Sequence, residues 1–257
     1  MMPPRPWLRR LGMLAWVVAI LGGLHGTAGA ACPALLPGMP PPIDVQAQPH
    51  EDAGWRAKLA ELNQKLRTQD VSRVRVLFLG DSLMEGWAPL VYQQFYGHRR
   101  ALNLGVRGDA TQTLLWRLAQ VPLGKTLRPQ LVVLLIGTNN LWPGRNAAEI
   151  ALGVGAVVQH IQQRTPQSKI LLVGLLPRAA STQDPLRQLA GQVNRLIAGC
   201  ADGKSVFYTE AGRMLLDGQG ALSEQVAFDY LHLTWMGYAI LAAALEPDIR
   251  RLLQEPG

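Results

Sequence analysis

Ser82 is the residue of this sequence that is best placed for nucleophilic chemistry. A short apolar run, residues 74–80, ends in Gly80, and Asp81 and then Ser82 follow it. Such a run is typical of a strand buried on both faces, and a serine directly after it lies at the carboxyl edge of a parallel sheet. Peptide N–H groups of the following helix can stabilise an oxyanion there. The structural alternative is that Gly-Asp-Ser is only a turn and helix cap.

A serine is a poor nucleophile without a general base, and His232 is the best candidate among the five histidines. Asp229 lies three residues before it, in a loop that precedes a helix. A carboxylate at that spacing can hold one ring nitrogen and leave the other free for a serine hydroxyl. An acid and a histidine three apart are common by chance, so the pair gains weight only beside other motifs.

Two further polar motifs follow predicted strands. Residues 103–108 come after the second strand, and residues 137–140 (Gly-Thr-Asn-Asn) come after the third. Because parallel strands end at one edge of a sheet, these motifs and Ser82 should lie close together.

Strand-like and helix-like segments alternate along the chain, and no hairpin signal appears. The expected strands are 74–80, 101–104, 130–136, 169–176 and 205–209. The expected helices are 52–69, 83–96, 111–119, 146–164, 184–198 and one from about 234, with a break or kink at Pro247. This order predicts an α/β fold with a doubly wound, flavodoxin-like parallel sheet of about five strands.

The chain divides into three parts. Residues 1–30 read as a secretory signal peptide, with early arginines, an apolar run and a small-residue site that ends at Ala30. Residues 31–51 form a proline-rich leader that we expect to be poorly packed. Residues 52–257 form one catalytic-sized domain. The signal peptide predicts that the protein is exported to the periplasm or the medium. A lipoprotein anchored through Cys32 is a minor alternative to a free exported protein.

Charge and cysteine content narrow the function classes. The chain carries +7, and the signal's three arginines leave 7 − 3 = +4 on the mature part. No basic cluster is interleaved with aromatics, so nucleic-acid binding has little support, and Lys and Arg should lie on solvated faces.

Cys32 and Cys200 pair in an oxidising compartment only if they are close, which the sequence leaves open. No Cys/His spacing suggests zinc.

Taken together, four blocks resemble those of the SGNH (GDSL) hydrolase family, most closely its platelet-activating-factor acetylhydrolase branch. The blocks are residues 80–83, 103–108, 137–140 and 229–232. The resemblance runs from about residue 74 to the last helix, and the four blocks in this order are specific although each alone is not.

The resemblance implies a division of roles. Ser82 would be the nucleophile, His232 the general base and then acid, and Asp229 the residue that orients it. The oxyanion hole would consist of the Ser82 N–H, the Gly108 N–H and the Asn139 side chain. Asp81 would cap the helix, Asn140 would shape its loop, and Leu83 and Leu231 either line the acyl pocket or pack in the core. No metal or organic cofactor is implied.

The predicted function is that of an exported serine esterase acting on short-chain acyl esters, of lysophospholipid, acetyl or carbohydrate type. An acyltransferase with the same triad and a non-catalytic binding protein remain alternatives. Two features depart from the family pattern: the signal peptide, since the subunits resembled are cytoplasmic, and Arg107, where relatives commonly have a small residue. Arg107 either meets an acidic substrate group or is solvated. The related subunits dimerise, which leaves a homodimer open.

Overall fold

The computed structural model describes residues 31–142 and 144–256, so the predicted signal peptide lies outside the described residues. Its centre is one sheet of five parallel strands in the order β2-β1-β3-β4-β5. The strands are β1 (Val76–Gly80), β2 (Ala101–Asn103), β3 (Leu131–Leu135), β4 (Lys169–Val173) and β5 (Val206–Thr209). The predicted doubly wound α/β fold is confirmed.

The interior strand β1 is apolar throughout because it has a core on each face. Leu77 and Leu79 belong to one hydrophobic cluster, and Val76 and Phe78 belong to the other. All four side chains are completely buried. Successive residues of a strand point to opposite faces, so a strand covered on both sides needs an unbroken apolar run.

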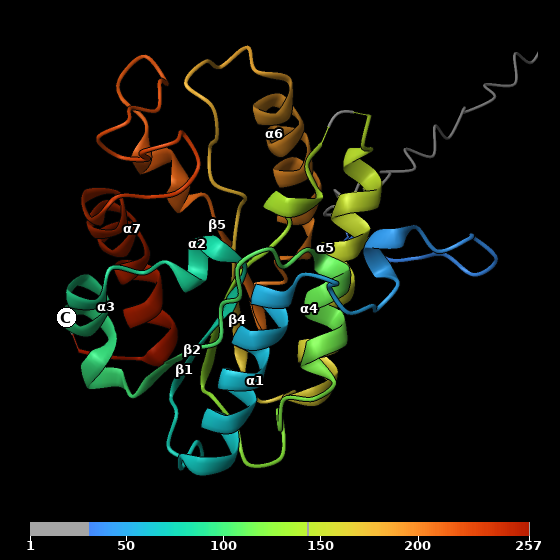
Figure 1. The fold of residues 1–257 in the computed structure, drawn as a ribbon, viewed down its shortest axis with the longest axis vertical. Coiled ribbons are helices and arrows are strands. Elements are labelled where there is room, and N and C mark those ends of the chain that lie inside the picture. Colours follow the sequence, from blue (N-terminus) through green and yellow to red (C-terminus); the bar gives the residue numbers. More distant parts are fainter. Residues whose placement is uncertain (1–30, 143, 257) are drawn as a thin grey trace, which may run out of the picture.

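Helices cover both faces of the sheet (Figure 1). One face carries α1 (Ala53–Thr68), α4 (Thr111–Leu118), α5 (Ala147–Arg164) and α6 (Pro185–Ile197). The other carries α2 (Ser82–Glu85), α3 (Pro89–Tyr96) and α7 (Trp235–Leu253). Short 3₁₀ helices are η1 (Ile43–Val45), η2 (Gly97–Arg99), η3 (Thr138–Asn140), η4 (Ala198–Cys200) and η5 (Ala211–Leu215). Within the described residues, no helix has the length and apolarity needed to cross a membrane.

Two helix predictions differ from the structure. The helix expected over 83–96 is two helices, because Pro89 occupies the first turn of α3 and starts it anew. Gly86 ends α2 where a β-carbon would lie 2.6 Å from the Tyr238 hydroxyl, so α7 can approach closely there. The last helix continues past Pro247 to Leu253, so the break that was one of the two expected outcomes at this proline does not occur.

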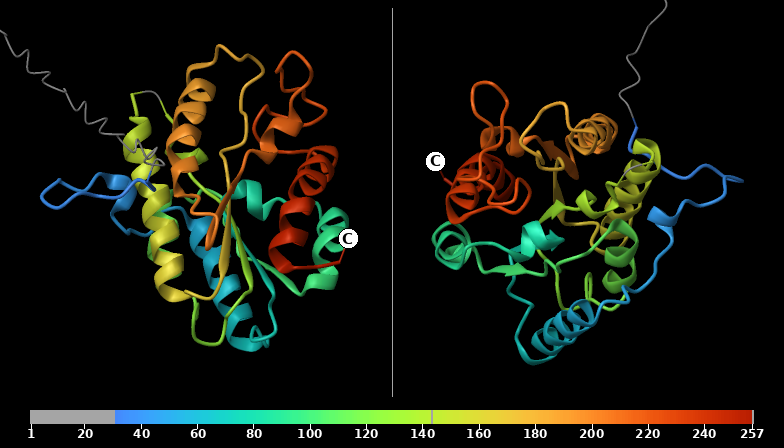
Figure 2. Two further views of the ribbon diagram at one scale, coloured as in Figure 1. Left: turned by 180° about the vertical axis from the view of Figure 1, so that it is seen from behind. Right: turned by 45° about the horizontal axis from the view of Figure 1, so that its top comes forward.

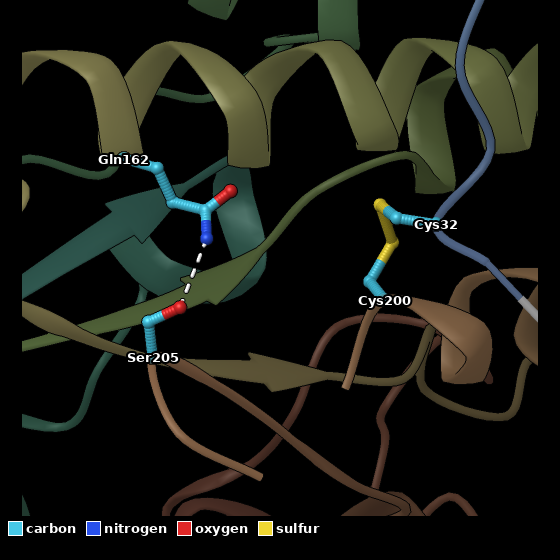
Figure 3. Close-up of a disulfide and its surroundings, with 4 residues drawn as sticks. All are labelled: Cys32, Gln162, Cys200 and Ser205. Carbon is cyan, nitrogen blue, oxygen red and sulfur yellow. Dashed lines mark hydrogen bonds between the residues drawn. A yellow bond between two sulfur atoms is a disulfide. The ribbon is translucent and has the colours of Figure 1, made fainter. Parts of the chain in front are cut away.

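Most of the proline-rich leader is exposed, as expected, but the segment is fastened to the domain at separate points. A disulfide joins Cys32 to Cys200 (Figure 3), and Pro33 packs against α5 so closely that a β-carbon at Gly155 would lie 2.1 Å from the Pro33 carbonyl oxygen. Asp44 of η1 is completely buried. Figure 2 shows this segment passing beside α5, with part of it projecting from the domain as a loop. Proline fixes the local shape of the segment, and contacts distant in sequence fix its place.

The expectation that arginines lie on solvated faces fails at two positions. Arg99 and Arg117 are each only 1% exposed. Arg99 pairs with Glu246 and Glu255 near the end of α7, and Arg117 pairs with Asp109. Buried guanidinium groups need such partners because an unpaired buried charge is costly.

Candidate active site

Ser82 is the first residue of α2, and only Asp81 separates it from the end of strand β1. The Asp81 carboxylate caps this helix by accepting a hydrogen bond from the Leu83 N–H at 2.9 Å. Ser82 is 7% exposed, so its hydroxyl is held at the bottom of a depression and not on an open surface. The Ser82 N–H is free of helix bonding because the first N–H groups of a helix have no acceptor within it.

The structure brings the side chains of Ser82, His232 and Asp229 together, although 150 positions separate the serine from the histidine. The Ser82 Oγ lies 3.0 Å from His232 Nε2, and His232 Nδ1 lies 2.7 Å from Asp229 Oδ2. With the proton on Nδ1 shared with the carboxylate, Nε2 is the acceptor for the serine proton. The arrangement can therefore turn the serine hydroxyl into a nucleophile.

The loop 227–233 fixes the histidine. The second oxygen of Asp229 accepts hydrogen bonds from the backbone N–H groups of Leu231 and His232, at 3.0 and 2.6 Å. Partial burial would raise the pKa of Asp229, but the hydrogen bonds from His232 and Leu231 outweigh it and hold the pKa below its usual value. The carboxylate thus stays ionised opposite the imidazole. Tyr230 takes a left-handed backbone conformation, with φ of 59°, in the turn between the two residues.

Gly108 and Asn139 follow strands β2 and β3 and line one cavity. Gly108 has φ of +82°, a conformation that favours glycine, and it leaves its N–H without a hydrogen-bond acceptor among the described residues. The Asn139 side-chain nitrogen donates to the Asp109 carbonyl oxygen at 2.8 Å. An amide carries two hydrogens, so one orients the group and the other is available for a substrate oxygen.

A buried network that the sequence analysis missed supports this loop. Asp109 is completely buried, and its carboxylate pairs with Arg117 and accepts hydrogen bonds from Trp55 Nε1 at 2.7 Å and Thr113 Oγ1 at 3.0 Å. Arg117 also donates to the carbonyl oxygen of Gly80, at the end of β1, at 3.2 Å. The pair therefore ties the Gly108 loop to the strand that carries Ser82. An arginine eight residues after an aspartate gives no sequence signal of this contact.

Asp81 has an unusual environment. It is completely buried, one carboxylate oxygen has no hydrogen-bond partner among the residues that the structure describes, and burial raises its pKa from 3.8 to about 7. The Leu83 N–H opposes this shift, while the charge of Asp109 adds to it. Asp81 caps the helix that begins at Ser82, as expected, and makes no hydrogen bond to His232.

One cavity is lined by the catalytic candidates Ser82 and His232, and another by the oxyanion-hole candidates Gly108 and Asn139. The first, of about 330 Å³, is also lined by Phe228 and the exposed Arg107, among others. The second, of about 380 Å³, also contains Leu231, together with His50 of the N-terminal segment. His50 gave no signal in the sequence, since it lies outside the four blocks. Asn140 shapes its loop as expected, because its side chain accepts a hydrogen bond from the Thr111 N–H at 3.0 Å.

The two leucines proposed for an acyl pocket lie in different places. Leu231 lines the cavity that holds the oxyanion-hole candidates. Leu83 is completely buried in the core between the sheet and α7, and its carbonyl oxygen accepts a hydrogen bond from Tyr238 at 3.0 Å. Of the two alternatives for Leu83, a place in the acyl pocket or in the core, the structure shows the core. Among the described residues, no group of three or more His, Cys, Asp or Glu is placed to hold a metal ion.

Comparisons with known proteins agree with this geometry. The model of the GDSL-like lipase/acylhydrolase family matches residues 78–240. The alpha1 subunit of platelet-activating factor acetylhydrolase IB from Homo sapiens is 36% identical over 182 residues, which cover 70% of this chain and 77% of that protein. The alpha2 subunit from Bos taurus is 37% identical over 182 residues, covering 70% and 78%.

Solved structures show the same fold at lower identity. A GDSL-like lipase from Bacteroides thetaiotaomicron superposes with a TM-score of 0.62 at 22% identity, covering 76% of this chain and 97% of that one. An acetylxylan esterase from Geobacillus stearothermophilus gives 0.55 at 20% identity, covering 73% and 98%. With the family match and the serine, histidine and aspartate in one hydrogen-bonded row, the chain belongs to the GDSL-like lipase/acylhydrolase family and is a serine hydrolase acting on carboxylic ester bonds.

Proposed function

We propose that this protein is an exported serine esterase that cleaves short-chain acyl esters through an acyl-enzyme. The observation that carries the proposal is the hydrogen-bonded row from Ser82 Oγ through His232 to the Asp229 carboxylate. In this row Ser82 is the nucleophile, His232 the base and Asp229 the group that orients it.

The reaction follows from these positions. Ser82 Oγ attacks the ester carbonyl while His232 Nε2 takes the hydroxyl proton. The oxyanion then accepts hydrogen bonds from the N–H groups of Ser82 and Gly108 and from the Asn139 amide. His232 returns the proton to the departing alcohol, which leaves an acyl group on Ser82. Water, deprotonated by the same histidine, releases the acid and restores the serine.

The cavity beside the oxyanion-hole candidates has room for an acyl group, and the names of similar proteins support a short one. The volume of this cavity is about 380 Å³, and Leu231, Leu141 and Trp142 give it an apolar part. The names of two similar proteins, an acetylhydrolase subunit and an acetylxylan esterase, describe acetyl esters as their substrates. Acetyl esters are therefore the first substrates to test.

Export is supported by two observations. Residues 1–30 carry the composition of a signal peptide. The Cys32–Cys200 disulfide joins the first residues of the mature chain to the end of α6, and such bonds persist in oxidising compartments. Fractionation of cells that express the full chain should place the processed protein outside the cytoplasm, whereas an unprocessed cytoplasmic protein would contradict export.

The activity is tested on purified protein lacking residues 1–30, with aryl esters of increasing acyl length. We expect the highest kcat/KM for acetate or another short acyl group, and no turnover by Ser82→Ala, whose folding is checked by circular dichroism. Ser72→Ala, at an exposed serine, is the matched control and should keep full activity. A wild-type protein that neither hydrolyses aryl acetates nor reacts with a fluorophosphonate would refute the proposal and favour a non-catalytic binding protein.

Adding a sugar alcohol as acceptor separates a hydrolase from a transferase. Free acid remains the product of a hydrolase at any acceptor concentration. Transfer of most acyl groups to the acceptor would contradict a hydrolytic function and favour the transferase alternative, since both share the acyl-enzyme.

A further inference from the structure

The N-terminal segment 31–51 is fastened to the domain at several points. The Cys32–Cys200 disulfide ties its first residues to η4 (Figure 3). Further along, η1 packs against α5, where a β-carbon at Gly153 would lie only 2.8 Å from the Asp44 side chain. The segment therefore has a defined position on the molecule, and the groups it carries can be part of a site.

Asp44 is the one charged residue of η1, and it is completely buried. One carboxylate oxygen accepts a hydrogen bond from Asn140 Nδ2 at 2.7 Å, and the other pairs with Arg145. Its backbone carbonyl accepts a hydrogen bond from Thr111 Oγ1 at 2.8 Å. A buried carboxylate is costly unless it is paired and hydrogen-bonded, so this residue is held by partners that lie far from it in sequence.

Asn140 connects both loops that supply oxyanion-hole candidates. It follows Asn139 in η3, and its side-chain oxygen accepts a hydrogen bond from the N–H of Thr111, three residues after Gly108. The contact to Asp44 is the shortest that its amide nitrogen makes, since Thr111 Oγ1 and Gln112 Oε1 lie at 3.1 and 3.0 Å. The orientation of the Asn140 amide thus depends on the carboxylate from the N-terminal segment.

We propose that Asp44 is a positioning residue for the oxyanion hole: it orients Asn140, and through it the Gly108 N–H and the Asn139 amide. This inference rests on the proposed function, because Asp44 would position the oxyanion hole of the proposed esterase. Asp44 lies outside residues 78–240, which the family model matches. The N-terminal segment is then a component of the active site and not a spacer before it.

A residue of this kind should affect kcat more than KM. The oxyanion exists only in the transition state and the tetrahedral intermediate, so misaligned donors weaken binding of these species and not of the ester. Displacement of catalytic groups by about 1 Å can cost up to about 100-fold in rate. We expect Asp44→Ala to lower kcat by about 10- to 100-fold with KM nearly unchanged.

The test is a double-mutant cycle on aryl acetate hydrolysis, with Asp44→Ala, Asn140→Ala and the double variant. If Asp44 acts through Asn140, the double variant loses no more kcat than Asn140→Ala does. Arg145→Gln is the matched control: it removes the same ion pair and leaves the carboxylate for Asn140, so kcat should stay within about twofold of wild type. The inference is overturned if the Asp44 and Asn140 losses multiply, if KM alone changes, or if Arg145→Gln loses as much kcat.

Two additions keep the test decisive. If Asp44→Ala does not fold, Asp44→Leu replaces it in the cycle, because leucine fills a similar volume and offers Asn140 no acceptor. The rate of Ser82 labelling by a fluorophosphonate, whose phosphoryl oxygen enters the same hole, is measured in parallel. Equal labelling rates of wild type and Asp44→Ala would refute the positioning role, whereas a wild type that neither labels nor turns over would refute the proposed function itself.

Discussion

The role of Asn139 can be tested by replacing it with alanine. Its side-chain nitrogen is fixed by the Asp109 carbonyl oxygen at 2.8 Å, so the second hydrogen is oriented before substrate arrives. The N–H groups of Ser82 and Gly108 remain in the variant, and the Ser82–His232 hydrogen bond is untouched. One of the three proposed oxyanion donors is lost, and the proposed nucleophile and base are kept.

The expected loss is large in kcat and small in KM. Removing one oxyanion donor costs on the order of 10²–10³ in kcat, about 3–4 kcal/mol of transition-state stabilisation. The ground-state ester carbonyl gains little from the amide, so KM should change by about twofold at most. The free energy of unfolding should fall by about 1 kcal/mol, because one hydrogen bond to the Asp109 carbonyl oxygen disappears.

The assay is steady-state hydrolysis of an aryl acetate, together with urea unfolding of the same preparations. Asn146→Ala is the matched control, since this helix cap also makes one side-chain hydrogen bond to the backbone, to the Ala148 N–H at 2.8 Å. It should lose about 1 kcal/mol of stability and no activity. A kcat of Asn139→Ala within about threefold of wild type would remove Asn139 from the oxyanion hole.

Two further predictions concern the pKa of Asp81 and the disulfide. The pKa of Asp81 is raised from 3.8 to about 7, so the folded state keeps a proton that the unfolded chain loses. The free energy of unfolding should therefore fall as pH rises from about 4 to 7, and urea unfolding of Asp81→Asn should lack this fall. The double variant Cys32→Ser/Cys200→Ser should lose up to about 5 kcal/mol, given the sequence separation of 168, and an unchanged urea midpoint would contradict a constraint on the unfolded chain.

The sheet was predictable because its strands are short apolar runs with both faces buried. In β3 every residue from Leu131 to Leu135 is buried, and the pattern allows no solvent-facing position. Helix boundaries were predictable where a cap marks them, as at Asp184, which accepts hydrogen bonds from the first turn of α6. The break between α2 and α3 was missed, although Pro89 carried the signal for a new helix start.

The candidate site was predictable as a set of residues but not as a geometry. Each motif follows a strand or precedes a helix, and parallel strands end at a common edge, so Ser82, Gly108 and Asn139 had to lie near one another. The contact between Ser82 and His232, at 3.0 Å, depends on how the loop before α7 folds back over that edge. Leu83 shows the limit of such reasoning. It is adjacent to Ser82 in sequence, which suggested a place in the acyl pocket, but its side chain is buried in the core.

The sequence by itself determined the alternation of strands and helices, the edge at which polar motifs gather, and the residue types that could perform ester hydrolysis. Only the tertiary structure decided which charges are buried and what the N-terminal segment does. Asp44 and Arg117 look like ordinary surface residues in sequence, and they are buried because Asn140, Arg145 and Asp109 are brought to them by the fold. Local patterns report which face of an element is apolar, whereas the partner that makes a buried charge tolerable is known only once distant segments have packed.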